Sequence, residues 1–334
     1  MHARSNLQRP RAKWLVGTVT AAFLLTACGG GDTDDSTTDE VEQTDDGEAA
    51  ADDGEAADDG EATGDVGEGR EVNIGWIPWE EDIAVTNLWQ VILEENGYSV
   101  TQTQADVAPV FDGVATGELD LYLDAWLPST HSDYWDEYGD QVEDLGAWLD
   151  EAPLTWVVPE YVDVDSIEEL ADNAEMFDSR IVGIEPGSGL ARISSEEVMP
   201  AYGLEDWEHV TGSTAAMLSE LEAAISNEEP IVVTLWEPHP AYGQYDLKNL
   251  EDPEGALGEP DEIRAIAREG FSEDFPELTQ AFEQFDFDAG TLAELEVAVL
   301  VDAGEGNELE GARTWLDENR DVVAEWLEGT GLGV

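Results

Sequence analysis

The sequence predicts an α/β protein with parallel sheets, and three observations support this fold class. Short apolar runs alternate with longer amphipathic stretches from about residue 70 onward. Strands that alternate with helices in this way usually form parallel sheets with helices packed on their faces. Residues 70–334 provide about 265 positions, which is long for one domain and enough for two. Hydrophobic residues make up 42% of the chain, so it can bury a core despite its many charges.

Apolar runs predict the strands of this region in chain order. They lie at 72–77, 98–103, 119–125, 155–158, 180–184, near His209, and at 231–234. Helical spacing of apolar residues falls between them, at 83–96, 110–115, 191–202 and 213–226. Ser166 with Glu169 in capping-box register predicts one more helix. From about Asp261 the pattern predicts mostly helix, with Trp315 and Trp326 as packing residues.

The N-terminus has the pattern of a secretory signal. Residues 4–13 are basic, and 14–25 form an apolar run that is too short to span a bilayer as a helix. The run leads into Cys28, the only cysteine of the chain, so no disulfide can form within it. We interpret residues 1–27 as a signal peptide with a lipobox and Cys28 as a lipidated N-terminus; a stray cysteine near a cleavage site is the alternative. Acylated Cys28 would anchor the protein stably to the outer face of the cell membrane.

Acidic residues dominate the composition, with 80 Asp and Glu against 12 Lys and Arg and a formal net charge of −68. Residues 28–69 consist almost wholly of Gly, Ala, Thr, Asp and Glu, which predicts a disordered spacer. The charge rules out nucleic-acid binding through phosphate neutralisation, which needs a basic stripe. It also argues against docking on an anionic membrane surface. An acid excess of this size indicates a surface that stays soluble in concentrated salt.

Four predicted strands end in residues that have binding chemistry. Three of these ends place a Trp beside a Pro-containing turn, and two of the three add a histidine. The segments are 76–81 (WIPWEE), 126–131 (WLPSTH) and 236–240 (WEPHP). The fourth end is the turn Gly187-Ser188-Gly189. Because ligands of such sheets bind beyond the carboxyl ends of the strands, these side chains are expected to share a site.

Several indoles around one cleft indicate a quaternary ammonium ligand. Such a cation has no N–H to donate, but the face of an aromatic ring attracts it, Trp most strongly, by roughly 0.5–2 kcal/mol per contact. The turn Gly187-Ser188-Gly189 ahead of a helix offers free backbone amides for an anion, and the helix start after Trp79 does the same. A cage and an anion site together fit a zwitterion with a trimethylammonium group.

These residues also resemble a known family. The segments PWEEDIAVTNLW, LYLDAWLPSTH, IVGIEPGSG and VVTLWEPHP, with YDLKNLEDP after them, look like the glycine betaine/choline class of ABC-transporter substrate-binding proteins. The resemblance extends from about residue 72 to the C-terminus. It implies a two-lobed periplasmic-binding-protein fold (type II) with the ligand cleft between the lobes. Residues 70–150 and 250–334 would form lobe I, and residues 151–249 would form lobe II.

The resemblance implies roles for particular residues. Cage tryptophans of the family match Trp79, Trp126 and Trp236, and Trp76 is a weaker candidate. The protein would be an extracytoplasmic monomer that delivers its ligand to a permease with ATPase subunits, without a cofactor or a metal ion. Such proteins are lipoproteins in single-membrane bacteria, which agrees with the interpretation of Cys28.

Glycine betaine, as an osmoprotectant, is the ligand that the sequence favours. Choline binders of the class tend to have Tyr at the position of Leu154 and Asn at that of Ser188. His131 and His239 favour a ligand with a carboxylate. A carboxylate in the cleft, for which Glu81 is the candidate beside Glu80 and Glu237, would favour a cation. A choline or carnitine receptor therefore remains the alternative.

Other classes of function have weaker support. The chain contains no G-x-S-x-G, H-E-x-x-H or P-loop motif, so we predict that it is not an enzyme. A calcium-binding surface lipoprotein would use the many acids. However, the segment Asp286-x-Asp288-x-Gly290 lacks the Glu at position 12 of an EF-hand loop.

The charge predicts that folding depends on salt. From Arg70 onward the chain has 63 acids and 8 bases, and the repulsion among them is screened only when the ionic strength is high. We expect the melting temperature to rise steadily between low and molar NaCl. A melting temperature that stays flat over this range would contradict the prediction.

Overall fold

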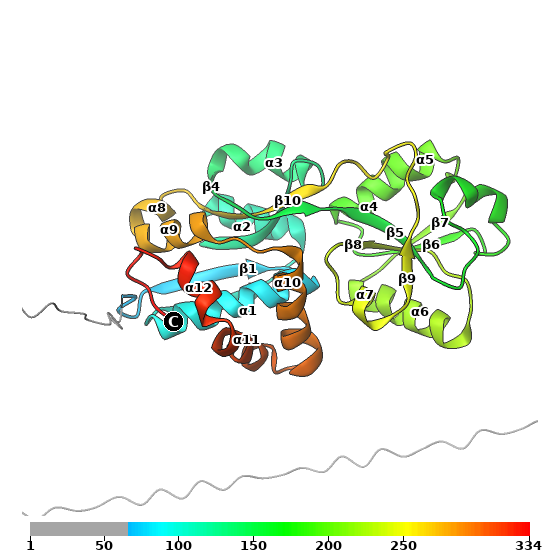
Figure 1. Cartoon of the computed structure of the whole chain (residues 1–334). Helices are drawn as coiled ribbons and strands as arrows, with labels where there is room; N and C mark the ends of the chain where they lie inside the picture. Colours follow the sequence, from blue (N-terminus) through cyan, green and yellow to red (C-terminus); the bar gives the residue numbers. More distant parts are fainter. Residues whose placement is uncertain (1–65) are drawn as a thin grey trace, which may run out of the picture. The chain divides into compact units, whose positions relative to one another are not determined.

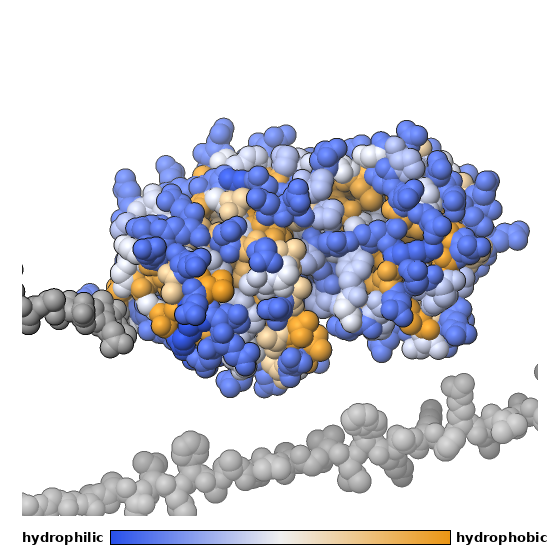
Figure 2. Space-filling model, viewed as in Figure 1, coloured by the Kyte–Doolittle hydropathy of each residue, from blue (hydrophilic) through white to orange (hydrophobic). Residues whose placement is uncertain are grey.

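The computed structural model describes residues 66–334 (Figure 1). The predicted signal peptide, Cys28 and nearly all of the predicted spacer lie outside the described residues. Within residues 66–334, every helix is too short or too polar to cross a bilayer. On the face seen in Figure 2, hydrophilic residues surround small apolar areas.

The first sheet has five strands in the order β2-β1-β3-β10-β4. The strands are β1 (Glu71–Trp76), β2 (Ser99–Gln104), β3 (Leu121–Leu127), β4 (Val142–Ala152) and β10 (Asp261–Arg268). Strand β1 pairs parallel with both β2 and β3, whereas β10 runs antiparallel to β3 and to β4. The sheet is therefore mixed.

Helices from two separate parts of the chain accompany this sheet (Figure 1). From the first part come α1 (Glu80–Glu95), α2 (Val107–Thr116), α3 (Ser132–Tyr138) and the 3₁₀ turn η1 (Gly139–Gln141). From the C-terminal part come α8 (Phe271–Asp274), α9 (Pro276–Gln284), α10 (Ala289–Glu296), the π-helical η5 (Val297–Asp302), α11 (Glu308–Glu318) and α12 (Arg320–Trp326).

Buried aromatic rings join these two parts. Trp89 of α1 is fully buried, with its ring centroid 4.2 Å from that of Phe282 and 6.4 Å from that of Trp326. Trp315 and Trp326 are each 3% exposed, as the sequence predicts for packing residues. The packing holds α1, whose first turn reaches the site, against the C-terminal helices.

The second sheet also has five strands, in the order β7-β6-β8-β5-β9. They are β5 (Leu154–Pro159), β6 (Arg180–Gly183), β7 (Glu208–Thr211), β8 (Val233–Trp236) and β9 (Leu247–Asn249). Its helical segments are η2 (Ile167–Glu169), η3 (Ala171–Asn173), α4 (Gly189–Ile193), the π-helical η4 (Ser194–Val198), α5 (Met199–Ala201), α6 (Thr214–Asn227) and α7 (Ala241–Gln244). Strand β6 is parallel to β7 and β8, and β5 is antiparallel to β8 and β9.

We use lobe I for the first sheet with its helices and lobe II for the second. The chain passes from β4 to β5 at Pro153, and it returns between β9 and β10. Both α/β lobes therefore come from one chain that leaves lobe I once and comes back.

Two details of the sequence prediction are wrong. Residues from Asp261 are mostly helical, as expected, but the segment begins with an unexpected strand, β10, which lies between β3 and β4. Its Glu, Arg and Ala residues favour helix, and two ladders of backbone hydrogen bonds override that preference. The helix expected after Ser166 is only the 3₁₀ turn η2, where the Ser166 side chain accepts from the N–H of Glu168.

Candidate functional site

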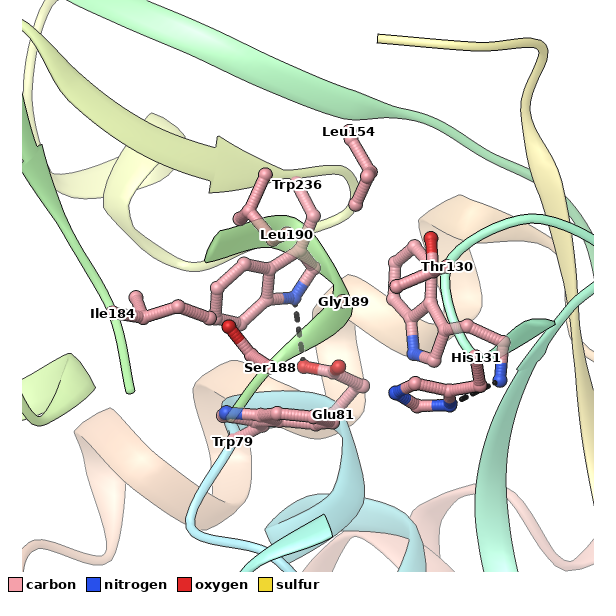
Figure 3. Close-up of a pocket in the computed structure, with 11 residues that line it drawn as sticks. Trp79, Glu81, Thr130, His131, Leu154, Ile184, Ser188, Gly189, Leu190 and Trp236 are labelled. Carbon is pink, nitrogen blue, oxygen red and sulfur yellow. Dashed lines mark hydrogen bonds between the residues drawn. The ribbon is translucent and has the colours of Figure 1, made fainter. Parts of the chain in front are cut away.

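A cavity lies between the two lobes, where the carboxyl ends of β1, β3, β6 and β8 approach one another. Its cavity volume is about 20 Å³. Lobe I lines it with Trp79, Glu81, Trp126, Thr130 and His131, and lobe II lines it with Leu154, Ile184, Ser188, Gly189, Leu190 and Trp236 (Figure 3). The topology explains the position, because parallel strands present their following loops at one edge of a sheet.

The structure brings the three predicted cage tryptophans together in this cavity. Trp79, Trp126 and Trp236 are 4%, 3% and 3% exposed. The rings of Trp79 and Trp236 lie 6.4 Å apart at 60°, so two faces of the cavity are inclined to each other. His131 stacks on Trp79 with ring centroids 5.7 Å apart.

Each of these indoles donates its N–H to a carboxyl oxygen. Trp126 Nε1 donates to Asp124 Oδ1 at 2.8 Å, within lobe I. The other two bonds cross between the lobes. Trp79 Nε1 donates to Glu185 Oε2 at 3.3 Å, and Trp236 Nε1 donates to Glu81 Oε2 at 2.8 Å. These bonds hold the rings in place and connect the lobes across the cavity.

His131 places an unused donor at the cavity. Its Nδ1 accepts from the backbone N–H of Trp126 at 3.0 Å, so the proton of the neutral ring is on Nε2. Burial, and secondarily the charge of Arg192, lowers the pKa of His131 to about 3, so the ring is neutral near pH 7. Within residues 66–334 its Nε2 has no hydrogen-bond partner. A buried N–H donor of this kind can bind a ligand carboxylate.

The glycine turn also contributes to the cavity, but only in part. Ser188 and Gly189 line it, whereas Gly187 is exposed and borders a neighbouring hollow. The Ser188 hydroxyl accepts from the N–H of Ala191 at 3.1 Å and thereby caps α4. The first N–H groups of a helix have no partner within it, so those of Gly189 and Leu190 remain for an anion.

His239, Trp76 and Glu237 do not line the cavity. The His239 ring lies edge-on to Trp236, with centroids 4.8 Å apart. Its Nδ1 accepts from the N–H of Ala241 at 3.0 Å, and its Nε2 lies 3.2 Å from Glu80 Oε2 across the lobes. His239 is thus placed to support the back of a cage ring. Glu237 accepts from the side chain of Asn249 instead.

Contacts at one rim of the cleft also join the lobes. Arg192 of lobe II forms an ion pair with Asp133 at 3.2 Å and donates to the carbonyl of Ser129 at 3.2 Å. Tyr134 of lobe I donates its hydroxyl proton to the carbonyl of Gly187 at 2.9 Å. The two lobes are therefore closed against each other in this structure.

Sequence reasoning missed a residue that shapes the site. Asp261, at the start of β10, accepts from the N–H groups of Ser129 and Thr130 at 2.7 and 2.8 Å, and from the Thr130 hydroxyl. It is 2% exposed and holds the loop between Trp126 and His131. Asp261 lies more than a hundred residues from that loop in the sequence, so no local pattern predicts the contact.

Buried acids surround the cage, and their pKa values rise. Burial raises the pKa of Glu81 well above its usual range, and the charges of Glu296 and Glu80 add to this. Burial raises the pKa of Asp82 to about 7, although the Ile77 N–H and the Thr86 hydroxyl stabilise its charged form.

Asp288, which the sequence offered for a calcium site, has another role. Asp288 accepts from the N–H groups of Gly290 and Thr291 and caps α10. Within residues 66–334, no three His, Cys, Asp or Glu side chains are arranged to hold a metal ion.

Two α/β lobes that close on a cavity lined from both sides define a substrate-binding protein of the periplasmic type. Residues 70–318 match the family model described as the substrate binding domain of ABC-type glycine betaine transport systems. The chain therefore belongs to this family, whose members are components of transporters.

Individual relatives agree with this assignment. The glycine betaine/carnitine transport binding protein GbuC of Listeria monocytogenes is 35% identical over 161 residues, which cover 47% of this chain. This chain spans about half, 52%, of the length of that relative.

Solved structures show the same fold. Lactococcal OpuAC, in its closed conformation with glycine betaine, is 33% identical with a TM-score of 0.72, covering 78% of this chain and 100% of that one. A glycine betaine/L-proline-binding protein (ProX) from Borrelia burgdorferi is 28% identical with a TM-score of 0.74, covering 78% and 98%.

The Asp261 carboxylate is expected to stabilise the site loop. Asp261→Asn would turn one acceptor into a donor that faces N–H groups, at a cost of about 1–3 kcal/mol in the free energy of unfolding. Urea unfolding at molar salt would measure this. The neighbouring change Glu262→Gln, on the solvent side of β10, is the control and should cost less. Equal midpoints for Asp261→Asn and wild type would show that the loop does not depend on this carboxylate.

Proposed function

We propose that this protein is the extracytoplasmic substrate-binding component of an ABC importer and that its ligand is glycine betaine, taken up for osmoprotection. The observation that carries the proposal is the set of three buried indoles around one cavity between two closing lobes. A quaternary ammonium group has no N–H for a hydrogen-bond acceptor. Each ring face attracts it by roughly 0.5–2 kcal/mol.

The ligand carboxylate would lie on donors at the other side of the cavity. His131 Nε2–H supplies one, and the N–H groups at the start of α4 supply others. Because His131 is neutral, it would contribute a hydrogen bond without adding a positive charge beside the ligand's ammonium group.

Closure would follow from the contacts that cross the cleft. When the lobes meet, the bonds Trp79–Glu185 and Trp236–Glu81 form, and water leaves the cavity. Exclusion of water strengthens the attraction between the cation and the rings. The closed protein would then deliver its ligand to a permease with its ATPase subunits. We propose that Cys28 holds it at the membrane by a lipid anchor and that it acts as a monomer, with no catalytic step.

Choline is the second candidate, and one observation favours it. Glu81 brings a carboxyl group into the cavity, 1% exposed, where a negative charge would attract a cation and repel a ligand carboxylate.

The cage predicts the effect of removing its rings. Trp126→Ala or Trp236→Ala should weaken glycine betaine binding by at least about 1–2 kcal/mol each, roughly 5- to 30-fold in Kd. Calorimetric titration of each variant would measure this, with circular dichroism to check the fold. Trp76→Ala is the matched control, because Trp76 is also a tryptophan at the end of a strand, β1, but does not line the cavity. Unchanged affinity in both cage variants, with the fold intact, would refute the cage.

Lobe closure predicts a second effect. A Cβ atom on Gly189 would lie 2.0 Å from the backbone carbonyl oxygen of Thr130 in the opposite lobe. Gly189→Ala should therefore hinder closure and weaken binding by about tenfold or more, a typical cost of overpacking. Gly187→Ala, whose Cβ would meet nothing within 4 Å, is the control and should bind like wild type. Equal affinities for the two variants would show that the ligand is bound without this lobe contact.

A further inference from the structure

Among residues 66–334, Glu81 is the one carboxyl group that both lines the cavity and joins the lobes. It comes from the first turn of α1 in lobe I, and its Oε2 accepts from the Trp236 indole of lobe II at 2.8 Å. Figure 3 shows this carboxyl between the rings of Trp79 and Trp236. A ligand cation held by those rings would lie against it.

Other titratable groups face Glu81 from every element around it. Glu80 and Asp82 flank it on α1, Tyr122 and Asp124 lie on β3, and Glu296 lies on α10. His131 lines the same cavity, and His239 contacts the neighbouring Glu80. Glu296 is fully buried, and neither of its carboxyl oxygens has a hydrogen-bond partner within residues 66–334. Asp124 Oδ2 and the Tyr122 hydroxyl also lack one there.

No basic side chain of the described residues balances these acids. The eight Lys and Arg residues all form ion pairs elsewhere, with Glu277, Glu220, Asp133, Asp165, Asp144, Glu262, Asp120, Asp274, Glu95 and Asp317. His131 is neutral, and His239 reaches only Glu80. A buried carboxyl without a cationic partner keeps its proton, so protons neutralise the closed, empty cluster.

We propose that Glu81 selects the ligand by net charge, exchanging its proton for a ligand cation that has no carboxylate of its own. With the proton on Glu81, the cavity takes a zwitterion such as glycine betaine. Without it, the cavity takes a cation such as choline and repels the zwitterion's carboxylate. The proton that leaves the Glu81 carboxyl passes to solvent as choline binds. This inference rests on the proposed function.

The test is calorimetric titration of the full-length chain at molar salt with choline and with glycine betaine. The titrations run from about pH 5.5 to about pH 8.5, on both sides of neutrality. Buffers of different ionisation enthalpy would count the protons exchanged. Choline affinity should rise with pH, by up to tenfold per pH unit where one proton is exchanged, with release of up to one proton. Glycine betaine affinity should stay level or fall, without proton release.

Variants separate the contributions. Glu81→Gln should make choline affinity independent of pH and abolish proton release, while glycine betaine still binds. Glu237→Gln, next to Trp236 but outside the cavity, should keep the wild-type profile. The proton count on the wild-type chain does not depend on whether any variant folds.

The outcomes are distinguishable. If both ligands bind with the same pH profile, or if Glu81→Gln keeps the wild-type choline profile, selection by Glu81 is refuted while the proposed function stands. If neither ligand binds to the wild-type chain at any pH, the proposed function fails and this inference fails with it.

Discussion

The site depends on one repeated interaction, the hydrogen bond from an indole N–H to a carboxyl oxygen. Trp79, Trp126 and Trp236 each make one, so each ring is held at its edge and offers its face to the cavity. Two of the three bonds cross between the lobes. Ring orientation and lobe closure are therefore coupled, because the cage is complete only when both lobes supply their acceptors.

The acids of this chain do two different physical tasks. Most are exposed, where water and salt solvate them and keep the protein soluble. A few, among them Glu81, Asp82, Asp124 and Glu296, are buried around the cage without any basic partner. Burial makes their charged forms costly.

Strand β10 connects the architecture to the site. The chain returns from lobe II into the middle of the first sheet, and the first residue of that strand, Asp261, holds the loop that carries Thr130 and His131. The loop in turn places His131 against Trp79. Asp261 therefore begins the strand that returns the chain to lobe I and also fixes the loop that carries His131.

The sequence alone determined the α/β class, most strands and helices and the family resemblance, and it picked out three tryptophans that line one cavity, because apolar periodicity and Trp-Pro strand ends are local patterns. Only the tertiary structure decided the rest. The β10 segment has helix-forming residues, and pairing with two neighbours makes it a strand. His131 and His239 follow similar Trp-Pro segments, yet only His131 lines the cavity, since different backbone N–H groups orient the two rings. The sequence offered Glu81 beside Glu80 and Glu237, and only the fold shows that Glu81 alone of these three lines the cavity, because burial is a property of the fold.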